Sequence, residues 1–453
     1  MLRRIIPFAA CFVFILTFSS CFQDRWPEYA GQTRLDTWID SIMRQDYLWY
    51  KDIPNSKELN YFSRPDKFLQ TIISRTHDNK YSHVDTIREI PEPSYGFDYT
   101  LYRNAHNDTL FNILVTYVQP NSPADRAGLK RGQWIAEIND STITRKNEPL
   151  FLQSGRPLKL QMGVYAIEMV DEMETGVINK TDIVQLDGAE PVEDTPVHYY
   201  TILDTSNGPT GYIVYSHFTS GTRIDPEKYN NQLRSIFQKF SENGVTNLIL
   251  DLRYNRGGSL ATAQVVASLT ASAGEMGQPL ASLEYNSKKQ DKNQTLTFNK
   301  DLIGGMQPLE IQQGVIISGG LTSGVTGVLL NCLAPFNKWA LVGNSVKCPG
   351  VATEEFIYPL GTWALHPVTC YVKNAEGVDN SGNTFKANIS ASETSDLLHF
   401  LPFGNPEETL LQKALSIIEG SYQPDQKTHQ QPELIREVKA SRTNLSAQSG
   451  CRL

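Results

Sequence analysis

The sequence predicts a multidomain α/β protein with three folded parts: a helical N-terminal domain, a β-rich middle domain and a β/α core. The chain of 453 residues is too long for one ordinary hydrophobic core. Its hydrophobic pattern changes from helical stripes to alternating strand-like runs, and then to strands that alternate with helices. The predicted boundaries are 1–20 for a signal peptide, 21–92 for the helical domain, 93–165 for the β-rich domain, 166–204 for a connector, 205–421 for the core and 422–453 for a disordered tail.

The composition fits a globular protein and argues against a nucleic-acid partner. Hydrophobic residues make up 40% of the chain and charged residues 20%, the formal net charge is -8, and no basic run stands out. No cluster has the spacing of a metal site, and no motif indicates a cofactor, so none is expected. Beyond the N-terminal segment lie four cysteines that allow one disulfide, which the sequence cannot assign: Cys332, Cys348, Cys370 and Cys451.

The N-terminal segment has the features of an export signal. Met1–Arg4 is positively charged, and the apolar run over 5–18 is too short to span a membrane. The following Phe-Ser-Ser-Cys, which ends at Cys21, resembles a bacterial lipobox, and the resemblance implies cleavage before Cys21 and lipidation of its thiol. The alternative is an ordinary signal peptide with an incidental cysteine. Either case predicts a protein outside the cytoplasm, and the lipobox predicts a lipid anchor in the cell envelope, periplasmic or surface-exposed.

Two apolar stripes predict the helical N-terminal domain, because each recurs at the spacing of one helix face. The members of the two stripes are Leu35, Trp38, Ile39 and Ile42, and then Phe68, Leu69, Ile72 and Ile73.

The β-rich domain contains a motif with many fixed offsets. Residues 118–139 read VQPNSPADRAGLKRGQWIAEIN, in which Pro123 suits a first helical turn and Gly128 suits a helix C-cap with positive φ. The motif closely resembles the PDZ pattern. In PDZ-like modules a loop before one strand binds a peptide C-terminus, and the peptide then pairs with the sheet edge. Residues 95–98 stand where that loop belongs, and the alternative is a plain strand start. The predicted peptide-binding residues are Tyr95, Gly96, Phe97 and Asp98.

The core repeats the pattern strand, helix, strand. Residues 211–215 and 248–252 are short apolar runs, and the helix between them has the apolar stripe Leu233, Ile236, Phe237 and Phe240. The stretch over 314–351 adds a strand, a turn of small residues, a helix and another strand. This layout presents a side chain at a helix N-terminus, where many hydrolases place a nucleophile.

Together these motifs resemble the C-terminal processing, or tail-specific, serine peptidases over almost the whole mature chain. The resemblance rests on the PDZ-like motif, on Asp-Leu-Arg-Tyr-Asn-Arg-Gly-Gly over 251–258 and on Pro-Phe-Gly-Asn-Pro-Glu-Glu over 402–408. It implies a crotonase-like ββα core and a Ser–Lys dyad, in which a desolvated, neutral Lys takes the proton of the Ser hydroxyl. The partners it implies are peptides or protein C-termini.

Both positions of the implied dyad hold other residues in this sequence. Without gaps, the family's Ser motif falls on residues 322–327 and places the nucleophile at Gly324. Its Lys motif falls on residues 343–349 and places the base at Pro349. Glycine has no hydroxyl and proline has no side-chain amine. The resemblance therefore implies a peptidase fold without the peptidase reaction.

Nearby residues offer a rearranged dyad. Ser323 precedes the aligned nucleophile position by one residue, and Lys347 precedes the aligned base position by two. One step on a helix rotates a side chain by about 100°, so Ser323 would point in another direction unless the turn is rebuilt. The plainer interpretation makes Ser323 a helix N-cap and Lys347 a solvated turn residue. A thiolate at Cys348, paired with His366 or His217, is a further alternative without support in the sequence.

The backbone groups that bind a peptide carbonyl can remain in a protein that has lost the catalytic dyad. Gly257 and Gly258 can aim backbone N–H groups at a carbonyl oxygen, and the Val325 N–H stands at a helix start, so the three predict an oxyanion-hole-like nest. The alternative is that the two glycines only permit a tight turn. The leading hypothesis is a catalytically impaired, peptide-binding member of this peptidase family. The alternatives are an active endopeptidase that uses Ser323 and Lys347, and a structural scaffold.

Overall fold

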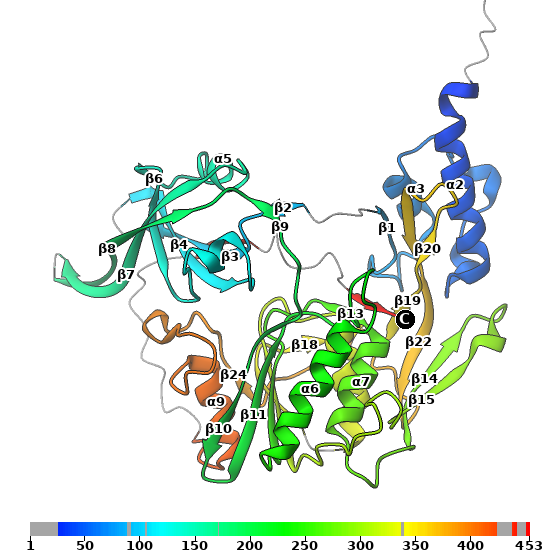
Figure 1. Cartoon of the computed structure of the whole chain (residues 1–453). Helices are drawn as coiled ribbons and strands as arrows, with labels where there is room; N and C mark the ends of the chain where they lie inside the picture. Colours follow the sequence, from blue (N-terminus) through cyan, green and yellow to red (C-terminus); the bar gives the residue numbers. More distant parts are fainter. Residues whose placement is uncertain are drawn as a thin grey trace, which may run out of the picture. The chain divides into compact units, whose positions relative to one another are not determined.

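The computed structural model describes residues 26–87, 92–104, 107–170, 172–336, 339–423, 437–441 and 450–453 (Figure 1). The described chain divides into two compact units, one of residues up to 87 together with 355–367, and one of the remainder. Within the described residues no helix is both long and apolar enough to cross a membrane. The predicted signal peptide and Cys21 lie outside the described residues.

The first unit joins two helices to a small sheet. The predicted apolar stripes contribute Leu35 and Ile39 from the first helix and Phe68, Leu69 and Ile72 from the second to the buried residues. The prediction assigned 355–367 to the core, but strand β21 pairs antiparallel with β1, with His83 opposite His366, so this hairpin belongs here. The elements are α2 (Trp26–Asp46), η1 (Tyr50–Asp52), η2 (Ser56–Glu58), α3 (Pro65–Ile72), β1 (His83–Thr86), β20 (Phe356–Ile357) and β21 (Trp363–His366).

The β-rich part of the second unit is one antiparallel sheet in the order β25-β3-β4-β5-β7-β8. Alternate residues of its strands, such as Ile113, Ile135 and Leu160, form its buried core. The predicted boundary at 165 falls inside β7, because β7 and β8 form one long hairpin. The elements are β2 (Pro93–Ser94), β3 (Phe97–Asn104), β4 (Asn107–Val118), α4 (Pro123–Arg126), β5 (Trp134–Ile138), β6 (Ser141–Thr142), α5 (Glu148–Leu152), β7 (Leu158–Val170), β8 (Met173–Leu186) and β9 (Glu190–Pro191).

The core holds a six-stranded sheet in the order β10-β11-β12-β16-β17-β24, which is parallel except for β10. Alternate residues face opposite sides: Ile213 and Ile316 pack with helices α6, α7 and α8, whereas Tyr212 and Val315 pack with α9. The elements are β10 (Val197–Thr205), β11 (Gly208–Tyr215), α6 (Lys228–Glu242), β12 (Asn247–Asp251), α7 (Leu260–Thr270), β16 (Gln313–Ser318), α8 (Val325–Leu333), η4 (Ala334–Phe336), β17 (Trp339–Gly343), β24 (Ile389–Ser390), η5 (Leu397–His399) and α9 (Thr409–Ile418).

A second core sheet runs in the order β13-β26-β19-β22-β14-β15. The prediction of a disordered tail is wrong for residues 450–452, which form strand β26, and for residues 437–441, which form β25 beside β3. The other tail residues from 424 onward lie outside the described chain. The remaining elements are β13 (Gly257–Ser259), β14 (Pro279–Tyr285), η3 (Gln290–Lys292), β15 (Gln294–Thr297), β18 (Val346–Lys347), β19 (Val351–Thr353), β22 (Val368–Asn374), β23 (Thr384–Phe385), β25 (Glu437–Ser441) and β26 (Gly450–Arg452).

Candidate functional site

The candidate site is the turn between β16 and α8. Helix α8 begins at Val325, and its N-cap is Gly324, whose backbone has φ +63° and ψ -128°. Non-glycine residues rarely adopt this conformation. The turn therefore depends on glycine at the position where the family pattern places a nucleophile.

Hydrogen bonds tie this turn to the loop that follows β12. The Thr322 hydroxyl donates to the Leu252 carbonyl at 2.8 Å, and the Ser323 N–H donates to the Asn255 carbonyl at 3.0 Å. The Asn255 side-chain oxygen accepts from the Gly257 N–H at 2.9 Å and from the Thr326 hydroxyl at 3.2 Å. Buried Asn255 thus holds the two loops of the site together.

Ser323 and Lys347 do not form a dyad in this structure. The Ser323 hydroxyl lies within hydrogen-bond distance of two backbone carbonyls, of Arg256 at 3.3 Å and of Leu321 at 3.2 Å, and its single proton is shared between them. Lys347 is exposed, and no hydrogen bond in the described chain joins it to Ser323. The expectation that Ser323 caps the helix is wrong, because the helix begins one residue later than a Ser323 cap requires and Gly324 takes the N-cap position.

Pro349, Cys348 and His217 make contacts that leave them without a catalytic partner in the described chain. Pro349 is buried, and its carbonyl accepts a hydrogen bond from the Ser381 hydroxyl at 3.0 Å. The Cys348 thiol contacts the Asp379 carbonyl at 3.5 Å, and burial raises its pKa to about 12. His217 is also buried, and its Nδ1 lies 3.0 Å from the Ser216 hydroxyl. A Cys348 thiolate paired with His217 therefore has no geometric basis. All four described cysteines are free thiols.

The predicted oxyanion-hole residues lie beside the turn, but part of their hydrogen-bonding capacity is used. Gly257 and Gly258 both have φ +128°, which only glycine adopts readily. The Gly257 N–H donates to Asn255, as above, and the Gly257 carbonyl accepts from the Phe218 N–H at 2.9 Å. The Val325 amide belongs to the first turn of α8, whose N–H groups have no partner within the helix.

Sequence reasoning missed one participant, the segment that begins at Gly450. A Cβ atom placed on Gly324 would lie 2.3 Å from the Gly450 carbonyl oxygen and 2.7 Å from its carbonyl carbon. The Gly450 N–H donates to the Arg256 carbonyl at 3.1 Å. The segment escaped notice because the residues before it are polar and its strand is only three residues long, so its order depends on neighbouring strands and not on propensity.

The predicted peptide-binding loop lies at the start of β3. Tyr95, Gly96, Phe97 and Asp98 are all buried. The carbonyls of Tyr95 and Gly96 accept hydrogen bonds from the N–H groups of Ala124, at 3.0 Å, and Gln119, at 2.7 Å. Gly96 has φ +78°, and a Cβ atom on it would lie 2.0 Å from Cβ of Ser122, the N-cap of α4. The loop is thus packed tightly against the short helix that the PDZ-like motif predicts.

A cluster of buried charged side chains packs next to the loop that follows β12. The Arg253 guanidinium, which is fully buried, donates to Asp251 at 2.7 Å and to Glu408 at 2.6 Å. Arg131, from the β-rich part, donates to the same Glu408 at 3.3 Å and to Glu393 at 3.0 Å. The cluster therefore connects the β-rich part to the core and fixes the loop after β12.

The cluster predicts loss of stability in acid. Burial alone would raise the pKa of Glu408, but the charge and hydrogen bonds of Arg253, together with Arg131, lower it to about 2. A carboxylate with a lowered folded-state pKa stabilises the fold above its unfolded-state pKa, and this contribution is lost as the pH falls toward the folded value. We expect the urea midpoint of unfolding to fall between about pH 4.5 and pH 2. A Glu408→Gln variant should show a smaller fall over that range.

One group of described residues has the chemistry of metal ligands. His83, Asp85 and His366, in the first unit, each offer one ligand atom within 4.8 Å of the others. His366 Nε2 lies 3.5 Å from Asp85 and 3.8 Å from Glu355. Nitrogen and carboxylate ligands of this kind suit Zn²⁺.

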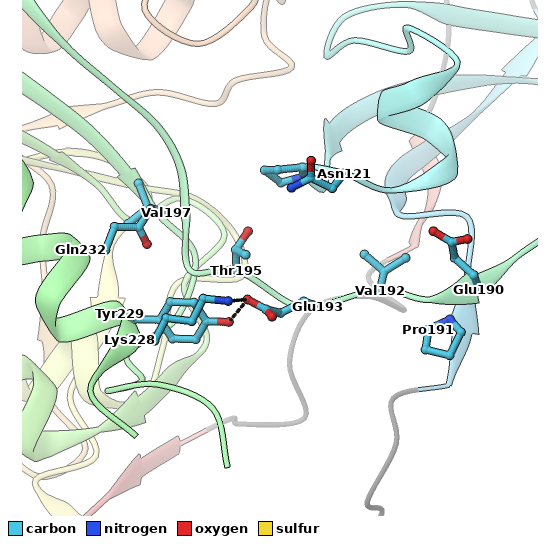
Figure 2. Close-up of a pocket in the computed structure, with 11 residues that line it drawn as sticks. Asn121, Glu190, Pro191, Val192, Glu193, Thr195, Val197, Lys228, Tyr229 and Gln232 are labelled. Carbon is cyan, nitrogen blue, oxygen red and sulfur yellow. Dashed lines mark hydrogen bonds and ion pairs between the residues drawn. The ribbon is translucent and has the colours of Figure 1, made fainter. Parts of the chain in front are cut away.

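A separate cavity of about 560 Å³ lies along the segment from β9 to β10 (Figure 2). Its walls include Asn121 of the β-rich part and Tyr229 of α6. The Glu193 carboxylate accepts hydrogen bonds from Lys228 and, at 2.8 Å, from the Tyr229 hydroxyl, and the Lys228 bond is the main cause of its lowered pKa. The lining residues do not include the turn at Gly324, so we place the candidate site at the turn.

Three family models match the chain in the order of its parts. A peptidase S41 N-terminal domain model matches residues 34–83, a PDZ domain model matches residues 114–150, and a peptidase family S41 model matches residues 209–315. The last match ends before the turn at Gly324.

Solved structures and curated proteins that are similar to this chain also include S41 and CtpA-like proteases. A crystal structure from Bacteroides fragilis NCTC 9343, assigned to the S41 proteases, is 40% identical, covers 85% of this chain and 98% of its own, and has a TM-score of 0.81. A CtpA-like serine protease of Staphylococcus epidermidis is 22% identical over 74% of this chain and 57% of its own length. One of Staphylococcus aureus (strain N315) is 24% identical over 54% and 43% respectively. The chain spans about half the length of these curated relatives.

Proposed function

Because this chain belongs to peptidase family S41, we propose that it is a cell-envelope lipoprotein that binds peptides or protein C-termini and no longer cleaves them. The lipid anchor in this proposal rests on the lipobox-like sequence that ends at Cys21. Relatives of the chain are described as CtpA-like serine proteases. We place the departure from them at two positions, Gly324 and Pro349.

The observation that carries the proposal is the packing around Gly324. Its backbone conformation suits only glycine, and a Cβ atom there would overlap the Gly450 carbonyl oxygen at 2.3 Å. A serine side chain does not fit this arrangement. In serine proteases, loss of the nucleophile lowers kcat by about a millionfold. The contacts of Ser323 with two backbone carbonyls also support a structural role for its hydroxyl.

Peptide binding is the function that the remaining features favour. The PDZ domain match contains α4. Strand β3 begins just after Gly96, and only β25 lies outside it in the sheet. Strand edges of this kind bind extended peptides through backbone hydrogen bonds. In the core, β13 pairs with Phe218 on one side and with β26 on the other, so the side that β26 covers is a second edge that accepts an extended chain.

Cleavage and binding can be tested on the same purified protein. We expect no cleavage of an unfolded polypeptide with an apolar C-terminus, and we expect the wild type and Ser323→Ala to give the same result by gel and mass spectrometry. If the wild type cleaves the polypeptide and the Ser323→Ala variant does not, the proposal is refuted and the rearranged dyad is established.

A matched pair of glycine variants tests binding. Gly96→Ala and Gly128→Ala both place alanine at positive φ, +78° and +80°, but only residue 96 collides with a neighbour. We expect fluorescence anisotropy to show at least tenfold weaker peptide binding for Gly96→Ala and near-normal binding for Gly128→Ala, with both far-UV spectra unchanged. Equal binding by both variants would move the peptide site away from the loop, and no binding by the wild type would favour a structural scaffold.

A further inference from the structure

Strand β26 fills a gap between two strands of the core. It pairs in parallel with β13, with Gly450 opposite Gly257 and Cys451 opposite Gly258. On its other side it pairs with β19. In the sheet order β13-β26-β19-β22-β14-β15 no other described strand joins β13 to β19. Figure 1 shows the red final strand beside β13 and β19.

The backbone of this segment runs directly along the candidate site. A Cβ atom on Gly257 would lie 1.9 Å from the Gly450 carbonyl oxygen, and one on Gly324 would lie 2.3 Å from it. Further along, the Thr353 hydroxyl donates to the Cys451 carbonyl at 3.3 Å, and the Leu453 N–H donates to the Thr353 carbonyl at 3.0 Å. An extended chain therefore crosses the family's nucleophile position with a carbonyl carbon next to it.

One side chain of the segment lies in the core. Cys451 is 4% exposed and packs in the same hydrophobic cluster as Val325 and Cys348. Its neighbours Gly450 and Arg452 are partly exposed. The position of Cys451 therefore accepts a small, apolar side chain. Gly450 has φ +98°, which favours glycine there, although a side chain at this position would have open space around it.

The same tail meets the proposed peptide-binding edge of the β-rich part. Strand β25 pairs antiparallel with β3, and the register places Ser441 opposite Tyr99 and Ala440 opposite Thr100. The pairing uses the outer edge of β3, where an added peptide strand would lie.

We propose that the two described pieces of the tail, 437–441 and 450–453, are intramolecular ligands that occupy the two strand-accepting edges, and that an external peptide must displace them to bind. This inference rests on the proposed function, because it concerns the regulation of the same peptide-binding edges. The ligand that best fits the core edge is an extended segment with glycine followed by a small, apolar residue.

A peptide of residues 446–453, carrying alanine in place of Cys451 and a fluorescent label, tests the core edge. We expect a chain that lacks residues 450–453 to bind this peptide at least tenfold more tightly than the full chain does, by fluorescence anisotropy. A peptide with the same residues in scrambled order should bind to neither. Equal affinities of the full and shortened chains would overturn the inference, as would absence of binding to a shortened chain that keeps its far-UV spectrum.

Thiol alkylation on the full chain gives a second test that needs no truncation. We expect Cys451 to react slowly with iodoacetamide, and the peptide at saturation to speed its reaction at least tenfold while the rates of Cys332 and Cys370 stay unchanged. Fast reaction of Cys451 without peptide would mean that the segment does not occupy the site. A rate that the peptide never changes would mean that it is a permanent strand.

These outcomes are independent of the binding test on the β-rich part. If the wild type and the shortened chain bind unfolded polypeptide equally, and only Gly96→Ala weakens that binding, the proposed function stands and the intramolecular ligand fails. If the shortened chain binds only the 446–453 peptide, the intramolecular ligand stands and the wider peptide-binding function fails.

Discussion

Replacing Glu408 with alanine is expected to lower the free energy of unfolding by about 3–5 kcal/mol, because it leaves buried guanidinium groups without their shared carboxylate. Arg253 is fully buried and donates two hydrogen bonds to Glu408, at 2.6 and 3.0 Å. Arg131 donates a third, at 3.3 Å. Removing the acceptor does not return either arginine to water, so the cost exceeds that of losing an ordinary ion pair. Urea unfolding followed by circular dichroism measures it.

An exposed ion pair in the same protein provides the control. Glu190 accepts from Arg126 at 2.9 Å, a length similar to the buried bonds, but both side chains are more than 40% exposed. We expect Glu190→Ala to cost less than about 1 kcal/mol. If Glu408→Ala costs no more than Glu190→Ala, the buried cluster is not the device that connects the β-rich part to the core.

The patterns that depend on local chemistry were predictable from the sequence. The stripe over Leu233, Ile236, Phe237 and Phe240 is buried on α6 as expected, because a periodic apolar face has one stable placement against a sheet. The PDZ-like offsets were equally informative: Ser122 caps α4, and Gly128 takes positive φ after it.

The features that the sequence concealed depend on partners far away in the chain. Strand β26 has three residues and is ordered by β13 and β19, which come about 190 and 100 residues earlier. The hairpin β20–β21 joins the first unit because its partner β1 lies there. The ion cluster shows the same limit, since Arg131 and Glu408 are ordinary surface residue types until the fold buries them together.

Ser323 shows how a shift of one residue changes the chemistry of a site. Serine before an apolar helix is typical of an N-cap, and a nucleophile in a rebuilt turn was the alternative. The positive φ of Gly324 delays the helix by one residue, so the Ser323 hydroxyl meets the carbonyls of Arg256 and Leu321. Backbone conformation, which no local pattern specified, decides between the interpretations.

The variant Gly324→Ser adds a hydroxyl at the position that the sequence resemblance aligns with the nucleophile. It is expected to destabilise the protein and to release the final segment without producing peptidase activity. The backbone at φ +63° and ψ -128° costs a non-glycine residue about 1–3 kcal/mol. The added Cβ atom also overlaps the Gly450 carbonyl oxygen at 2.3 Å and the Arg256 carbonyl oxygen at 2.7 Å. Gly450 can move away with its short strand, so we expect alkylation of Cys451 to rise at least tenfold. We expect no cleavage, because the position that the sequence resemblance aligns with the base holds Pro349.

Gly320→Ser is the matched control, because it adds the same side chain to the same turn with no atom within 4 Å and without positive φ. It should leave stability and Cys451 alkylation near the wild-type values. A double-mutant cycle of Gly324→Ser with removal of residues 450–453 then isolates the collision, since coupled sites lose about 0.5–3 kcal/mol of additivity. We expect the combined variant to be less destabilised than the sum of its parts. Full additivity would mean that residue 324 and the final segment do not compete for the same space, and recovered cleavage would mean that this site needs only its hydroxyl.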